Sequence, residues 1–146
     1  MELDENAKKI IDSMAKEIAE RSVKALRCCR ERYEVGMDVD PVLLNRVIAN
    51  CRVVFLAMYS PVCPYCELFY PIFVEVGRKY SSYAAFVRMN AYKHPEIAMS
   101  LGVETLPSTA VIIDGVPREL LVGYIDGPTF ESIVVETLRK AGCIEQ

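Results

Sequence analysis

An uninterrupted apolar run constrains the fold of this chain more than any other feature. The run from Arg52 to Tyr59 contains the sequence VVFLAMY and is bounded by polar residues and a proline. A strand that is covered on one face alternates between apolar and polar residues, whereas a strand buried on both faces is apolar throughout. The run therefore predicts a central strand of an α/β sheet with helices on both sides.

The rest of the chain alternates between helical and strand-like segments. The spacing of apolar residues and the turn signals predict a long helix over residues 1–33, short helices over 40–48 and 95–100, a helix over 67–80 that Pro71 should kink, a strand over 84–89, a hairpin of 109–113 with 119–123 across Asp114–Gly115, and a last helix over 130–140. Strands separated by helices pair in parallel, and the hairpin adds antiparallel strands. We therefore expect a mixed sheet.

The first helix is amphipathic and lies outside the alternating segments. Its apolar stripe includes Ile10, Ile11, Met14 and Ile18, with charged residues in most of the gaps. Three uses of this stripe are consistent with the pattern, namely docking on the body of the protein, self-association, and binding to a membrane surface. The membrane surface is the least favoured, because acidic residues interleave the lysines.

The charge and the hydropathy exclude several classes of protein. The net charge is -3 and the isoelectric point is near 5.3. This acidic balance argues against a nucleic-acid-binding protein, which usually has an excess of basic residues. No apolar run reaches the roughly 18 residues of a membrane span, and the first residues mix acids and lysines without the apolar core of a secretory signal. We therefore expect an intracellular, cytoplasmic protein.

Two cysteines follow the apolar run in the segment Cys63-Pro64-Tyr65-Cys66. In a reducing compartment such a pair is more often redox-active or metal-binding than a structural staple. A zinc site needs four ligands, but the sequence has no second C-x-x-C and its only histidine is His94. The pattern favours thiol–disulfide exchange over a metal site, a static disulfide or a packed pair.

The position of the pair at a strand-to-helix junction suits this chemistry. Free backbone N–H groups and the helix dipole at the start of a helix stabilise a thiolate at Cys63, and a thiolate is the species that attacks a disulfide. Cys66 lies one turn further along the same helix face and can resolve a mixed disulfide formed at Cys63. Pro64 fits the first turn, where a missing N–H costs nothing.

From about Val42 to Gly142, the chain resembles thioredoxin-fold proteins. The resemblance rests on four features in order: the apolar strand, the Cys63–Cys66 motif, the segment Thr105-Leu106-Pro107-Ser108-Thr109 just before a strand, and Gly123 after the hairpin. It implies a thioredoxin-like domain over residues 37–146, preceded by an amphipathic helical extension over residues 1–36.

The resemblance also implies a site for substrate. Pro107 corresponds to the family's cis-proline, which packs against the cysteine pair, and the alternative is an ordinary trans turn. The backbone of Leu106 would pair with an incoming polypeptide as an extra strand. Thr105, Leu106 and Pro107 are therefore expected to bind substrate.

The residues around the cysteines combine features of two groups within this superfamily. The dipeptide Pro64–Tyr65 is typical of glutaredoxins and is expected to tune the reduction potential. Thioredoxins carry a buried aspartate at the position of Ala57 and a tryptophan at that of Val62. Arg88 matches a lysine that the family places beneath the site. Its charge either favours a thiolate or simply lies in solvent.

The function expected from these residues is disulfide exchange with protein substrates, in which Cys63 attacks and Cys66 resolves. No G-x-G-x-x-G fingerprint for a flavin or nicotinamide cofactor is present, so a separate reductase or a low-molecular-weight thiol must recycle the pair. The alternatives are a glutathione-dependent glutaredoxin, and an adaptor module with incidental redox activity.

Four further cysteines, Cys28, Cys29, Cys51 and Cys143, follow no recognisable spacing. Cys28 or Cys29 could pair with Cys51 or Cys143, or accept a disulfide from the active site. Buried free thiols are the state we expect from the sequence.

Overall fold

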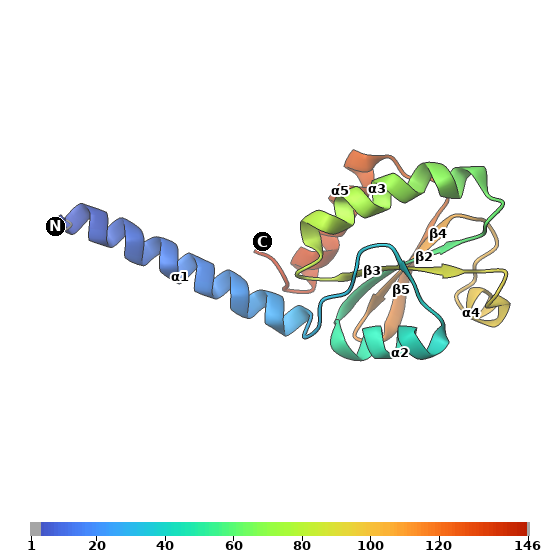
Figure 1. The fold of residues 1–146 in the computed structure, drawn as a ribbon, viewed down its shortest axis with the longest axis horizontal. Coiled ribbons are helices and arrows are strands. Elements are labelled where there is room, and N and C mark those ends of the chain that lie inside the picture. The colour runs from blue at the N-terminus through green and yellow to red at the C-terminus, as the bar shows by residue number, and fades with distance from the viewer. Residues whose placement is uncertain (1–3, 146) are drawn as a thin grey trace.

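The central strand of the sheet is β2 (Val53–Tyr59), as its apolar sequence predicts. In this computed structural model, which describes residues 4–145, the strand order is β1-β3-β2-β4-β5 (Figure 1). β3 (Ala85–Asn90) lies parallel to β2 on one side, and β4 (Ser108–Ile113) lies antiparallel to it on the other. The predicted mixed α/β sheet is confirmed.

The remaining elements surround these three strands. They are α1 (Glu5–Cys28), β1 (Met37–Asp38), α2 (Pro41–Asn50), α3 (Pro64–Tyr80), α4 (Pro95–Ser100), β5 (Val116–Val122) and α5 (Gly127–Lys140). β1 pairs in parallel with β3, and β5 pairs antiparallel with β4. A two-residue strand such as β1 is too short for a hydrophobic pattern to predict. The helix that contains Pro71 continues past it to Tyr80.

The two faces of the sheet carry separate cores. Figure 1 shows α3 and α5 on one side of the sheet and α2 on the other. On the first side, the rings of Phe55, Phe69, Phe73, Phe86 and Phe130 form one cluster of stacked and edge-to-face contacts. This aromatic cluster packs α3 against the sheet, and these contacts fix the start of α3 at the carboxyl end of β2.

α1 differs from the prediction in its end and in its packing. The helix ends at Cys28 and not near residue 33, because Cys29 has extended backbone angles and forms an antiparallel bridge with Cys51. Residues 8–21 are all exposed. Figure 1 shows that α1 joins the domain at the carboxyl end of the helix and extends away from it toward the N-terminus. Docking of the apolar stripe on the body of the protein is therefore wrong for this structure.

The four cysteines outside the C-x-x-C form two disulfides, so the expectation of free thiols is wrong. Cys28 bonds to Cys143 and Cys29 bonds to Cys51. Backbone hydrogen bonds from Arg30 N–H to Asn50 (2.8 Å) and from Arg52 N–H to Cys28 (2.7 Å) hold the second pair together. All four residues are buried. The two disulfides attach the carboxyl end of α1, which we call its root, to the domain.

Candidate active site

The cysteine pair lies at the carboxyl end of β2, where the chain turns into α3. Cys63 is the N-cap residue of α3, Pro64 occupies the first turn, and the Cys66 N–H donates to Cys63 Sγ at 3.2 Å. The two cysteines form a disulfide with their Cα atoms 5.2 Å apart. The reduced Cys63 sulfur would remain at the positive end of the α3 dipole, which lowers the pKa of a thiol.

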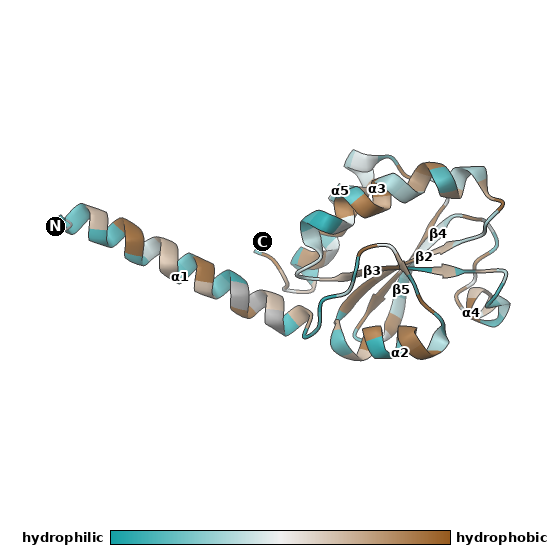
Figure 2. Cartoon of the chain, viewed as in Figure 1, coloured by the Kyte–Doolittle hydropathy of each residue, from teal (hydrophilic) through white to brown (hydrophobic). Residues whose placement is uncertain are grey.

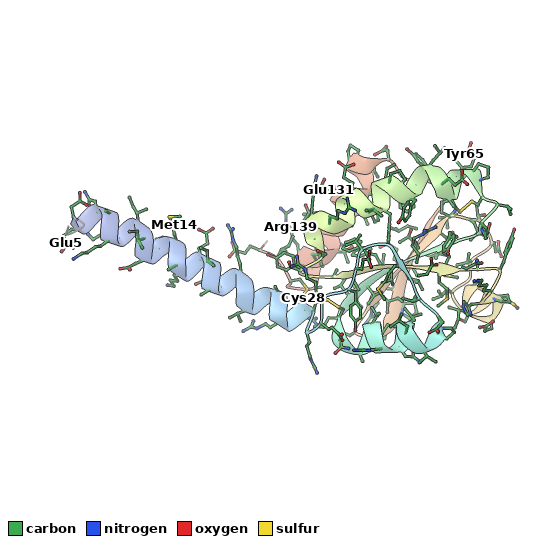
Figure 3. All side chains as sticks on the ribbon, in the orientation of Figure 1. Glu5, Met14, Cys28, Tyr65, Glu131 and Arg139 are labelled. Carbon is green, nitrogen blue, oxygen red and sulfur yellow. A yellow bond between two sulfur atoms is a disulfide. The ribbon has the colours of Figure 1, made fainter. Side chains whose placement is uncertain are left out.

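The two sulfurs differ in their access to solvent. Cys63 is half-buried, whereas Cys66 is 4% exposed and belongs to the inner face of α3. Val62 and Tyr65 flank the pair and are 75% and 63% exposed. Figure 3 shows the labelled Tyr65 at the start of α3, pointing away from the sheet. A large molecule can approach Cys63 across these two side chains but cannot reach Cys66 directly.

The loop before β4 faces the cysteine pair. The Leu106–Pro107 peptide bond is cis, and Pro107 is buried and shares a cavity of about 10 Å³ with Cys66. The loop is fixed at both ends, since Gly123 N–H donates to the Pro107 carbonyl at 2.8 Å and Ser108 Oγ donates to the Thr105 carbonyl at 2.6 Å. The structure thus brings Cys66 and Pro107 together, with Leu106 half-buried and Thr105 exposed beside them.

Arg88 lies near the buried side of the pair. Its guanidinium carbon is 3.7 Å from the centre of the Tyr59 ring and 4.4 Å from that of Tyr70. These three residues and Cys66 line a cleft of about 320 Å³. Ala57 is buried beside Cys66 in the smaller cavity, so no carboxylate occupies this position beneath the resolving sulfur.

The sequence analysis missed the aromatic partners of Arg88 and their acidic neighbour. The Tyr59 hydroxyl donates a hydrogen bond to the Asp38 carboxylate. Burial of the ring and this hydrogen bond raise the pKa of Tyr59 to about 12. The only available signal was the tyrosine at the end of the apolar run, because the strand that carries Asp38 was not predicted.

Among residues 4–145, no cluster of three or more histidine, cysteine or acidic side chains has the geometry to hold a metal ion. Within the same described part of the chain, no helix combines the length and apolarity needed to cross a bilayer.

The strand, the cysteine pair at a helix N-terminus and the cis-proline loop together define the thioredoxin fold. The family model described as Thioredoxin matches residues 40–136. The chain is 30% identical to a thioredoxin of Borreliella burgdorferi over 84 residues, which cover 57% of this chain and 71% of that protein. It is 25% identical to the chloroplastic thioredoxin M-type of Chlamydomonas reinhardtii over 109 residues, 75% of each chain.

A solved structure gives the same result for the fold. A mutant thioredoxin from Halobacterium salinarum superposes with a TM-score of 0.67 at 20% identity, covering 73% of this chain and 93% of that one. This chain belongs to the thioredoxin family. It is a thioredoxin-like thiol–disulfide oxidoreductase.

Proposed function

We propose that Cys63 and Cys66 form the redox centre, with Cys63 as the nucleophile and Cys66 as the resolving thiol. The observation that carries this proposal is the unequal exposure of the two sulfurs at the start of α3. A nucleophile must be reached by the substrate, whereas a resolving thiol needs to reach only the mixed disulfide beside it.

The proposed reaction proceeds in two exchanges. The Cys63 thiolate attacks one sulfur of a substrate disulfide, and the other substrate sulfur leaves as a thiolate and takes up a proton. Cys66 then loses its proton and attacks Cys63 Sγ, which forms the Cys63–Cys66 disulfide and releases the second substrate sulfur. The substrate gains two electrons and the cysteine pair loses two.

Protein disulfides are the substrates that this site fits best. We assign substrate binding to Thr105, Leu106 and Pro107, because their loop faces the cysteine pair and an extended polypeptide can pair with such a backbone. The exposed Val62 and Tyr65 provide apolar contact area on the other side of Cys63. A peptide segment bound between these two groups of residues would present its disulfide to Cys63.

The remaining parts of the proposal concern tuning, recycling and location. Pro64 and Tyr65 set the reduction potential through their effect on the first turn of α3. A separate reductase or a low-molecular-weight thiol returns two electrons to the pair. We also propose a cytoplasmic location. It requires the two outer disulfides to resist reduction, and the burial of Cys28, Cys29, Cys51 and Cys143 supports that resistance.

We divide the chain into a helical extension over residues 1–36 and a thioredoxin-like domain over residues 37–146. Met37, the first residue of β1, is the first residue that joins the sheet, which supports this boundary. Limited proteolysis of the native protein should cleave within the extension and leave the sheet intact. Early cleavage between β2 and α5 would contradict the division.

Insulin reduction with an external dithiol tests the redox centre. The Cys63→Ser variant should lose turnover, and Cys66→Ser should accumulate a mixed disulfide with the substrate that non-reducing electrophoresis detects. The double variant Cys29→Ala/Cys51→Ala is the matched control, because it removes a disulfide but keeps the C-x-x-C pair. It should retain turnover while it remains folded.

Three results would contradict the proposal. Full turnover by Cys63→Ser would place the nucleophile elsewhere. Turnover with glutathione and a small mixed disulfide, together with failure on protein substrates, would favour a glutaredoxin. Stable partner binding by a wild-type protein without any reductase activity would favour an adaptor module.

A further inference from the structure

α1 is firmly attached to the domain at one end, but no described contact covers its apolar stripe. Cys28 is the last residue of the helix and Cys29 follows it, and they are bonded to Cys143 and Cys51 respectively, so two neighbouring disulfides anchor this end of the helix to the domain. The helix has 24 residues, about 36 Å in length. Figure 3 shows the labelled Met14 side chain in solvent, far from the labelled Cys28 at the root.

Four apolar residues of α1 follow the spacing of a coiled coil, with Ile10 of the stripe beside their seam. Ala7, Ile11, Met14 and Ile18 are separated by four, three and four residues, which places them in one seam of alternating a and d positions. Ile11, Met14 and Ile18 are 50%, 56% and 60% exposed. Figure 2 shows brown, hydrophobic segments at intervals along a helix that is otherwise teal or pale. Most helical stability in proteins comes from packing of an amphipathic face and not from intrinsic propensity, so burial of the seam would stabilise α1.

We propose that α1 is a dimerisation arm that pairs in an antiparallel orientation with α1 of a second copy of this chain. In the register that opposes apolar residues throughout, Ile11 faces Met14 of the second copy and Ile18 faces Ala7 of the second copy. The next position of the seam is Arg21, and it faces Asp4 of the second copy. By symmetry, each contact occurs twice.

Charge selects this orientation over the parallel one. A parallel pair in register would place Arg21 against its own copy in the seam, where like charges repel. The antiparallel pair instead places Arg21 near the carboxylate of Asp4, at each end of the apolar segment. Arg21 also bonds Glu17 of its own helix at 2.6 Å, so its side chain already lies along the helix surface.

Two other features of the chain fit this pairing. Arg52, the residue before β2, is at the end of the sheet where α1 is attached, whereas Cys63 follows the opposite end of the same strand. Paired arms therefore leave the cysteine site of each copy open. A membrane surface fits the helix less well, because Glu5, Asp12 and Glu20 interleave its basic residues.

Sedimentation equilibrium on the full chain tests the proposal. We expect a reversible dimer at about 100 µM and dissociation on dilution. The Ile11→Glu/Ile18→Glu variant should be monomeric at the same concentration. Val23→Glu is the matched control, because Val23 is 49% exposed on the same helix but lies outside the seam, and it should remain dimeric. Insulin reduction should be unchanged in all three proteins, which shows that the domain is folded.

The orientation is tested by Arg21→Gln. Loss of the charge pair with Asp4 should weaken the antiparallel dimer by about two- to tenfold, whereas relief of repulsion would tighten a parallel one. A monomeric wild-type protein at about 100 µM overturns the dimerisation arm. So does a dimer that survives Ile11→Glu/Ile18→Glu, or seam-dependent binding to anionic vesicles by a monomer. A dimer tightened by Arg21→Gln overturns the antiparallel register.

Discussion

The guanidinium carbon of Arg88 lies 3.7 Å from the centre of the Tyr59 ring, in the wall of the cleft that also contains Cys66. The centre of the Tyr70 ring lies 4.4 Å from the same carbon. A cation held in this way interacts favourably with both rings and keeps a fixed position near the cysteine pair. Because Ala57 supplies no carboxylate beneath Cys66, the charged side chains that line the two cavities around the resolving thiol are Arg88 and Glu67, and only Arg88 favours a thiolate there.

Replacement of Arg88 should therefore raise the pKa of the cysteine thiols in the reduced protein. We expect an increase of a few tenths to about one pKa unit in Arg88→Leu, because a nearby positive charge favours the thiolate. Arg88→Lys should show a smaller increase. The measurement is the pH dependence of thiol alkylation in the fully reduced protein, with Arg118→Leu on β5 as the control. Equal profiles for wild type and Arg88→Leu would show that the cation is structural only.

The outer disulfides should differ in their contribution to stability. In the chain-entropy description, Cys28–Cys143, with a separation of 115 residues, contributes about 5 kcal/mol, and Cys29–Cys51, with a separation of 22, contributes about 3 kcal/mol. Urea denaturation of Cys28→Ala/Cys143→Ala should thus show a larger loss than that of Cys29→Ala/Cys51→Ala. The reverse order would mean that strain or residual structure in the unfolded chain outweighs loop entropy.

The sequence allowed the sheet to be predicted, because the apolar run and the Asp114–Gly115 turn each have a short-range signature. The loop opposite the cysteines was predicted from the resemblance to thioredoxin-fold proteins and not from a local pattern. The outer disulfides have none, since four cysteines allow three pairings and only the fold brings Cys143 to the root of α1. The end of α1 was misplaced for the same reason. Cys29 has an extended backbone because it pairs with Cys51, which lies 22 residues further along the chain.

Gly77 lies where the packing leaves no room for a side chain, and the helical sequence around it gives no sign of this. It lies inside α3, and a Cβ atom there would be 2.6 Å from Val35 Cγ1 and 3.0 Å from Phe86 Cγ. Gly77→Ala should destabilise the protein by about 1–3 kcal/mol, even though alanine is the better helix former. Gly127→Ala is the matched control in α5, because no atom lies within 4 Å of the added carbon. Thermal unfolding that leaves Gly77→Ala as stable as Gly127→Ala would mean that Val35 moves aside at no cost.

Glu131 in α5 links two residues of α3 and gives the stability a defined pH dependence. Its carboxylate accepts from Lys79 Nζ at 3.0 Å and from the Tyr80 hydroxyl at 2.8 Å. Lys79 first, and Tyr80 second, lower the pKa of Glu131 below its ordinary value of 4.5. The stabilisation is therefore fully present above about pH 4.5 and is lost as the pH falls through the lower pKa of the folded state.

The Glu131→Gln variant should consequently be less stable than the wild type at neutral pH, by about 0.2–1 kcal/mol for a partly exposed ion pair. The difference should vanish as the pH falls below the depressed pKa of Glu131, where the wild-type carboxyl is itself neutral. At high pH, burial and the hydrogen bond to Glu131 raise the pKa of Tyr80 to about 12. The stabilisation that comes from the Tyr80 hydroxyl is therefore lost as the pH rises from 10 to 12. Denaturation across this range, with Glu136→Gln as the control on the same helix, measures both effects. A Glu131→Gln difference that is constant from acid to neutral pH would show that shape, and not charge, gives Glu131 its role.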